Sequence, residues 1–163
     1  MPREHADIKM TPEELRAFLQ SDNRLVVATL DADGSGWVDA AVFTFYDDRV
    51  YFRLPVDSRS FRNIERDARV CCVVESKPAA SSYYDIKGAM LHGVADATAS
   101  ENLPAAVGET LATLPDPVTP DAACDGQIFS IGLDDHTSFV FAKIRYRYED
   151  RALKKIQADA GLV

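Results

Sequence analysis

The sequence has no long run of apolar residues. Nowhere in its 163 residues does an uninterrupted apolar stretch approach the roughly 18 needed to span a bilayer as a helix. Residues 1–7 also lack the apolar block of a secretory signal peptide. These two absences predict a cytoplasmic protein that does not interact with membranes.

Cysteine and histidine are scarce, with three of each in the chain. Cys71 and Cys72 are adjacent in a segment that predicts a strand, so their side chains point to opposite faces and cannot easily bind the same metal ion. The remaining cysteine and the histidines are scattered without metal-ligand spacing. We therefore expect no metal site, and we interpret the cysteines as buried free thiols in a reducing compartment.

Motifs of self-sufficient catalysis are missing as well. The sequence contains no Gly-x-Ser-x-Gly elbow, no Walker loop and no Gly-x-Gly-x-x-Gly run. The acidic pairs at 47–48 and 134–135 are typical of turns, and His92 is better interpreted as a packed or surface residue than as a base. The catalytic residues stay unknown, and any enzymatic chemistry is expected to come from a cofactor.

Positive charge is concentrated in one segment of an acidic chain. The net charge of −8 argues against nucleic acid and anionic membranes as partners. Between Arg49 and Arg69, however, there are six arginines and only three acidic residues. This local reversal favours a small anionic ligand, although the arginines can instead pair with the acidic remainder of the chain.

The centre of this segment predicts a strand, a tight loop and a helix N-terminus. Residues 50–54 alternate as in a strand, and Pro55 ends it because proline has no N–H for the ladder. Ser58 is a suitable N-cap for a helix over 59–67. Free backbone N–H groups, the helix dipole and arginine side chains together predict an anion site. The alternative is that the arginines form only a solvated helix face.

The rest of the pattern predicts a mainly β domain with peripheral helices. Thr11, Pro12 and Glu14 form a capping box and helix start, followed by an apolar stripe of Leu15, Phe18 and Leu19. The nearly continuous apolar run at 24–30 predicts a strand covered on both faces. The predicted strands are 24–30, 37–46, 49–54, 68–75, 83–97, 127–133 and 137–148. Further helices are expected after a cap at Ser100 and over 150–158.

Tight hairpins with few crossovers favour an antiparallel barrel decorated by helices. Gly88 and Gly93 lie within the fifth predicted strand and indicate a bulge, a bend or a close backbone approach. We expect one domain over 1–163, with a flexible segment at 1–10, a helix–loop insertion at 100–126 and a C-terminal helix at 150–160.

In this order and spacing, the motifs resemble the FMN-binding split-barrel superfamily, the pyridoxamine 5'-phosphate oxidase-like group that includes flavin- and deazaflavin-dependent oxidoreductases. Residues 28–34 are similar to the family's first hairpin, and residues 50–64 are similar to its phosphate-binding strand, loop and helix. Residues 65–70 are similar to the exit from that helix into the next strand, and residues 86–95 are similar to the fifth strand. The likeness covers roughly 11–97. It implies a six-stranded antiparallel split β-barrel of Greek-key type with flanking helices.

The resemblance also implies a homodimer with FMN in a groove between the subunits. The residues that it places against the phosphate are Phe52, Arg53, Ser58, Arg59 and Ser60, with a compensating role for Arg62. Those that it places under the ring and ribityl chain are Ala40, Ala41, Val42, Phe43 and Thr44. Family members often carry a cation where this chain has Ser60, and the oxidases carry basic residues on the second strand, where this chain has Asp39 and Thr44. These departures argue against pyridoxamine phosphate as substrate.

The leading hypothesis is an FMN-dependent oxidoreductase that exchanges a hydride with a small organic substrate. Lys143, Arg145 or Tyr146 are candidates for covering the site from the partner subunit. Three alternatives stay open: a deazaflavin-dependent reductase, a dimer that binds flavin, haem or a tetrapyrrole without turnover, and a barrel that has lost its cofactor.

Overall fold

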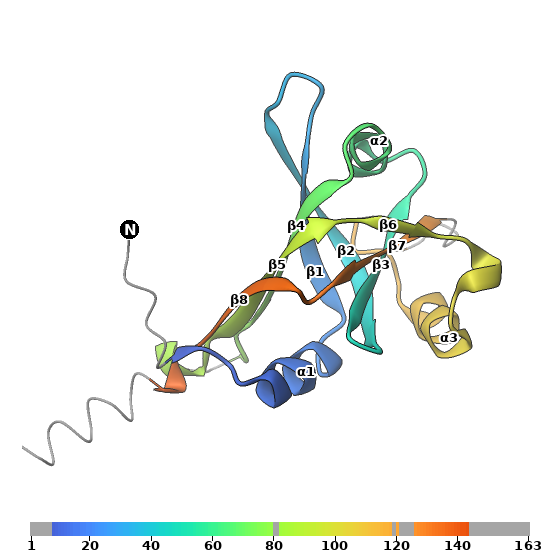
Figure 1. The fold of residues 1–163 in the computed structure, drawn as a ribbon. Coiled ribbons are helices and arrows are strands. Elements are labelled where there is room, and N and C mark those ends of the chain that lie inside the picture. Colours follow the sequence, from blue (N-terminus) through green and yellow to red (C-terminus); the bar gives the residue numbers. More distant parts are fainter. Residues whose placement is uncertain (1–7, 80–81, 119, 121–125, 144–163) are drawn as a thin grey trace, which may run out of the picture.

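The computed structural model describes residues 8–79, 82–118, 120 and 126–143 of the chain. They form one curled antiparallel sheet with three α-helices around it (Figure 1). The strands are β1 (Arg24–Leu30), β2 (Gly36–Tyr46), β3 (Arg49–Pro55), β4 (Arg69–Ser76), β5 (Lys87–Val94), β6 (Asp96–Thr98), β7 (Gly126–Gly132) and β8 (Asp135–Val140). The helices are α1 (Pro12–Gln20), α2 (Arg59–Arg66) and α3 (Ala105–Thr113).

The sheet closes into a barrel because two of its strands are bent. Its eight strands follow the order β6-β7-β3-β2-β1-β4-β5-β8. Only Ala95 separates β5 from β6, and a short turn separates β7 from β8. Since β5 pairs with β8 and β6 pairs with β7, these segments form two long strands that pair along both halves. The eight segments therefore make six strands, and the mainly β, six-stranded antiparallel split barrel expected from the sequence is confirmed.

The strand predicted over 83–97 is divided by a bend into β5 and β6, and a bend is one of the expectations for its glycines. Three residues lie between His92 and Asp96, whereas four lie between their partners, Asp135 and Ser130, so the pairing carries one extra residue on one side. Tyr83–Asp85 forms a short 3₁₀ helix before β5 begins. A close backbone approach, one of the expectations for Gly88, is confirmed, because a Cβ there would lie 2.7 Å from the Phe139 ring.

Two other boundaries differ from the sequence-based prediction. Ser100 begins a separate 3₁₀ turn (Ser100–Asn102), and α3 starts only after Pro104, which supplies the fixed backbone geometry of a helix start. The predicted strand over 137–148 ends at Val140, and a turn follows. Residues 144–148, the predicted C-terminal helix and residues 1–7 lie outside the described part of the chain.

The barrel interior is the hydrophobic core, and α1 closes one of its ends. Phe43, Phe52 and Leu91 are fully buried inside it. The predicted capping box of α1 is confirmed: the Glu14 N–H donates to Thr11 Oγ1 (3.2 Å), and the Thr11 N–H donates to the Glu14 carboxylate (2.8 Å). The helix then buries its predicted apolar stripe, Leu15, Phe18 and Leu19, against the core.

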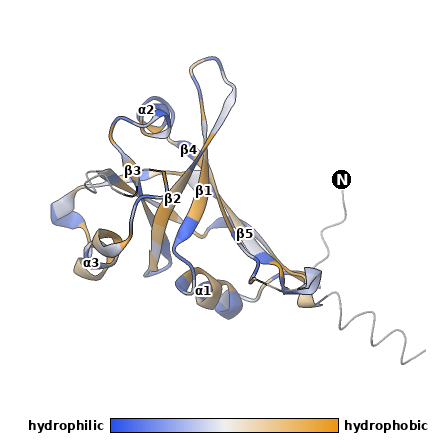
Figure 2. Cartoon of the chain, turned by 180° about the vertical axis from the view of Figure 1, so that it is seen from behind, coloured by the Kyte–Doolittle hydropathy of each residue, from blue (hydrophilic) through white to orange (hydrophobic). Residues whose placement is uncertain are grey.

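The outer face of the sheet is not uniformly covered. The prediction that β1 is covered on both faces is wrong for the described chain, because Leu25 and Val27 are buried whereas Val26 is 41% exposed. On β2–β3, in contrast, α3 packs against the outer face through Val107 and Leu111. Apolar colouring along the strands is visible from behind (Figure 2). No helix among the described residues is long and apolar enough to cross a membrane.

Candidate functional site

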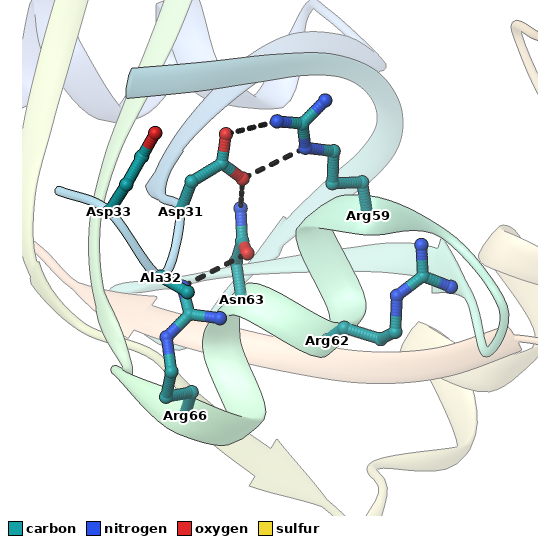
Figure 3. Close-up of a pocket in the computed structure, with 7 residues that line it drawn as sticks. All are labelled: Asp31, Ala32, Asp33, Arg59, Arg62, Asn63 and Arg66. Carbon is teal, nitrogen blue, oxygen red and sulfur yellow. Dashed lines mark hydrogen bonds and ion pairs between the residues drawn. The ribbon is translucent and has the colours of Figure 1, made fainter. Parts of the chain in front are cut away.

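An open pocket of about 620 Å³ lies between α2 and the turn that joins β1 to β2 (Figure 3). Seven residues line it: Asp31, Ala32, Asp33, Arg59, Arg62, Asn63 and Arg66. Three arginines come from one helix, and both acids come from the facing turn. The predicted segment thus forms a pocket with cationic and anionic sides.

Helix α2 forms where the sequence predicts it. The Ser58 Oγ accepts a hydrogen bond from the Phe61 N–H (3.1 Å), which caps the helix. Asn63 and Ile64 turn toward the barrel, whereas Arg62 and Arg66 are exposed. The helix therefore presents its guanidinium groups to the pocket from a fixed, amphipathic support.

Arg59 is held between a carboxylate and an indole ring. Its Nε donates to Asp31 Oδ1 (2.9 Å), and its Nη2 donates to Asp31 Oδ2. The guanidinium carbon lies 4.1 Å from the ring centroid of Trp37. The side chain of Arg59 is still 48% exposed, whereas that of Asp31 is only 10% exposed. The arginine is thus docked onto a nearly covered carboxylate and reachable from solvent.

Buried polar contacts fix that carboxylate in turn. Asn63, which is 3% exposed, donates from Nδ2 to Asp31 Oδ1 (2.9 Å) and to Thr29 Oγ1 (3.0 Å). Arg66 donates to the Leu30 carbonyl and to Asn63 Oδ1 (3.1 Å). These bonds join α2 to the end of β1 and preorganise Asp31 opposite Arg59.

Ser60 takes part in a second carboxylate contact. Its fully buried hydroxyl donates to Asp39 Oδ2 (2.6 Å), which also accepts the Trp37 Nε1–H (3.0 Å). Asp39 therefore fixes the indole on which Arg59 rests. Asp31, Asp33 and Asp39 each raise the pKa of Arg59, so three acids act on this one cation.

Arg53 lies away from this pocket, beneath α3. It is 4% exposed, and its Nη1 and Nη2 donate to the carbonyls of Leu111 (2.6 Å) and Leu114 (2.8 Å). These carbonyls belong to the C-terminal end of α3, where helix carbonyls lack partners within the helix. In the described structure Arg53 therefore caps a helix, and it does not line the arginine pocket.

The other predicted cofactor residues divide between two faces. Ala41, Phe43 and Phe52 point into the barrel and are fully buried in its core. On the outer face, α3 covers Val42, while Ala40 and Thr44 are half-buried. Arg62 lines the pocket and donates one bond, from Nη1 to the Asp57 carbonyl (2.5 Å). Lys143 lies beside α1, bonded to Glu14 (2.6 Å), and Arg145 and Tyr146 lie outside the described residues.

Sequence reasoning missed the roles of Asp31, Trp37, Asp39 and Asn63. The sequence did suggest, as an alternative, that the arginines pair with acids elsewhere in the chain. The structure shows such pairs between Arg49 and Asp96 and between Arg59 and Asp31. Which acid meets which arginine depends on the antiparallel fold and has no local signature.

Thiol and metal chemistry receive no support from the described residues. Burial raises the pKa of the Cys72 thiol to about 12, and it also raises that of Cys71, so neither is an activated thiolate. Within the described ranges, no group of three or more His, Cys, Asp or Glu residues is placed to hold a metal ion.

We expect acid to weaken the fold between about pH 4 and pH 2. The bond from Arg59, and then that from Asn63, lowers the pKa of Asp31 from 3.8 to about 2, and Arg69 does the same for Asp67. Depressed carboxyl pKa values stabilise the fold above the unfolded value, and this contribution is lost as the pH falls through the folded value. Urea midpoints measured from pH 5 to pH 2 check this. An Asp31→Asn variant with the same acid dependence as the wild type would contradict it.

Comparison with known proteins identifies relatives of this fold. A family model described as pyridoxamine 5'-phosphate oxidase matches residues 11–113, which is more than half of the chain. The matched region includes α1, the pocket and α3 up to its last residue. None of the curated proteins matches the chain.

Solved structures with the same fold are distant in sequence. A conserved hypothetical protein from Mycobacterium tuberculosis superposes with a TM-score of 0.64 at 18% identity, over 86% of this chain and 91% of that chain. An FAD-binding protein from Mycobacterium smegmatis gives 0.57 at 14% identity, over 80% of this chain and 95% of that one. A heme-binding protein from the same organism gives 0.55 at 16% identity, over 78% of this chain and 57% of that one.

Proposed function

Because this chain belongs to the pyridoxamine 5'-phosphate oxidase family of split barrels, we propose that it is a flavin-dependent oxidoreductase that uses FMN. The observation that carries the proposal is the pocket at α2, where Arg59, Arg62 and Arg66 face one open cavity of about 620 Å³. A phosphate monoester matches such a cluster, because guanidinium groups bind phosphate oxygens in pairs.

The fit to FMN rests on α2 and not on every residue that the sequence suggested. Arg59 is half-exposed, and Arg62 is exposed at the rim of the pocket. Arg53 and Ser60, in contrast, are buried and bonded within the chain. We therefore propose that Arg59 and Arg62 bind the phosphate end of FMN, with Arg66 lining the same pocket.

A bound flavin would supply the hydride chemistry, and the protein would bind and orient it. The α2 arginines would hold its anionic end. Ala40 and Thr44, half-buried on the outer face of β2, would lie along the ring and ribityl chain. A second subunit over this face would exclude water from the ring.

The proposed assembly is a homodimer through the outer face of β2, β1, β4 and β5. Here Val26 lies opposite both Ala40 and Val73, and Val73 lies opposite Met90. Val26 and Met90 are 41% and 37% exposed, and Val38 on β2 is 60% exposed. An apolar row of this kind on a sheet face is typical of a protein interface.

Replacing Val26 with glutamate is expected to break this dimer, because it places a charge at the centre of the apolar face. Sedimentation should give twice the 18.0 kDa chain mass for the wild type and the single chain mass for the variant. Val118→Glu is the matched control, since Val118 is 66% exposed and belongs to the loop after α3, not to one of these strands. A monomeric wild type, or a V26E variant that stays dimeric, would refute the interface.

The function is tested by titrating the purified protein with FMN and with riboflavin. Binding of FMN with quenching of flavin fluorescence, followed by reduction of the bound flavin by NADH or NADPH, is the expected result. Failure to bind either flavin would exclude the proposal. Binding without reduction across a panel of donors would favour a non-catalytic carrier of flavin or of haem, and parallel titrations with haem and deazaflavin separate these cases.

A further inference from the structure

The pocket contains an anion that belongs to the chain itself. Asp31 meets Arg59 through two N–H groups, which is the geometry in which arginine also binds two oxygens of a phosphate. The same N–H groups cannot serve both partners at once. An external phosphate that uses Arg59 in this forked geometry therefore has to displace Asp31.

We propose that Asp31 is a specificity-determining residue of this site: it is an internal competitor that occupies Arg59 until a ligand phosphate replaces it. This inference rests on the proposed function, because the ligand phosphate is taken to be that of FMN. Asp31 would then set how strongly a phosphorylated ligand is preferred over the same ligand without phosphate.

The surrounding contacts show that this pairing is built into the fold. Asn63 is 3% exposed and anchors Asp31 to Thr29 by two hydrogen bonds from one amide nitrogen. The Asp31 N–H donates to the Ser35 carbonyl (2.8 Å), so its backbone is also held by the turn. Because Asp31 cannot move away without breaking these bonds, Arg59 is the mobile partner in the exchange.

Arg59 can leave the carboxylate without unfolding its surroundings. Its side chain is 48% exposed, so water or a ligand can reach its N–H groups as it leaves the carboxylate. Arg62 lines the same pocket, so a dianionic phosphate would gain a second cation that Asp31 does not contact in the structure. A phosphate dianion thus binds the arginines more strongly than Asp31 does. The net gain is only the difference between the attraction of the arginines to phosphate and that of Arg59 to Asp31.

Trp37 provides a reporter of this exchange within the protein. It is the only tryptophan of the chain, and the Arg59 guanidinium carbon lies 4.1 Å from its ring centroid. Its Nε1–H is held by Asp39 (3.0 Å), which keeps the ring in place. When Arg59 leaves Asp31, the cation over this ring moves, and the emission of Trp37 is expected to change.

The test is a titration with inorganic phosphate, followed by Trp37 emission, at constant ionic strength. Asp31→Asn keeps a side-chain oxygen for Asn63 but removes the competing charge. Its emission should change at about tenfold lower phosphate than in the wild type, because the ligand no longer has to displace a carboxylate from two N–H groups of Arg59. Asp33→Asn is the matched control: it lines the same pocket and removes the same charge, but Asp33 has no hydrogen bond to Arg59. Because Asp33 acts on Arg59 only through space, its loss should shift the phosphate midpoint much less than the loss of Asp31 does.

Equal phosphate midpoints in D31N and D33N would overturn the proposal. Trp37→Phe should abolish the signal and so assigns it to this ring. Circular dichroism verifies folding, and if D31N fails to fold, Asp31→Ser tests the same loss of charge with a hydroxyl still available to Asn63. A phosphate midpoint that is lowered much more in D31N than in D33N supports the inference even when no flavin binds.

Titrations with FMN and riboflavin separate this inference from the proposed function. D31N should bind FMN about tenfold more tightly than the wild type, with riboflavin affinity unchanged. If FMN binds equally well to the wild type, D31N and D33N, the function stands and the competitor role fails. If neither flavin binds any of them while phosphate still acts preferentially on D31N, the flavin assignment fails and the competitor role stands.

Discussion

Replacing Arg53 with alanine is expected to lower the free energy of unfolding by about 3 kcal/mol. The guanidinium is 4% exposed and donates to two carbonyls at the end of α3, those of Leu111 and Leu114. Alanine would leave both carbonyls without these donors and would open a space beside Gly126, where an added Cβ would lie 2.7 Å from the arginine stem.

Chemical denaturation of the purified variant measures this effect. Arg16→Ala is the control, because Arg16 is an exposed arginine paired with the exposed Asp48 (2.7 Å), and its loss should change stability little. An Arg53→Ala variant as stable as Arg16→Ala would show that capping of α3 contributes nothing. Loss of α3 packing should also expose Val107 and Leu111, which raises the binding of an apolar dye.

This prediction changes how a loss of cofactor in such a variant would be interpreted. The resemblance to split-barrel flavoproteins places Arg53 at the phosphate, yet here it lies under α3, 58 residues away in sequence from the Leu111 carbonyl that it binds. Flavin loss in Arg53→Ala would therefore follow from disruption of α3 as readily as from loss of a ligand contact. Arg59 is the residue on which a phosphate role can be tested cleanly.

Local patterns were sufficient to predict most of the elements. The capping box at Thr11, the two-residue hairpin at Asp47–Asp48 and the Ser58 cap all depend on short-range geometry, and all three are present. At Asp47 and Asp48 the backbone adopts φ values of 47° and 57°, as a tight hairpin requires. Such features are readable because their partners lie within a few residues.

The features that local patterns did not determine depend on the barrel. The bend at Ala95 appears because one long strand must pair with β8 and then with β7, which alternation along a single segment does not reveal. The outer exposure of Val26 follows from which face closes on the core. The charge reversal in the arginine segment located the pocket. Whether Arg59 is free or already paired there depends on Asp31, which is 28 residues away in sequence and is brought to Arg59 only by the fold.

Replacing Arg59 with alanine is expected to weaken FMN binding by on the order of 100-fold while leaving riboflavin binding nearly unchanged. The two flavins differ only in the phosphate, so a selective loss locates the phosphate at Arg59. The fold should persist, because Asp31 retains its bond from Asn63, but the stabilisation that Arg59 gives Asp31 above about pH 4 is lost. Calorimetric titration of both ligands into the wild type and the variant gives the two ratios.

Arg69→Ala is the matched control for this experiment. Arg69 belongs to the same basic segment and is 71% exposed, but it pairs with Asp67 and does not line the pocket. Its removal changes the net charge by the same amount, so any general electrostatic effect on an anionic ligand appears in both variants. Equal FMN affinities in the two variants would show that Arg59 does not bind the phosphate. If Arg59→Ala weakens riboflavin binding as much as FMN binding, Arg59 instead contacts the ring or ribityl chain. Any preference of the protein for FMN over riboflavin would then come from another cation, and Arg62 on the same helix is the first candidate.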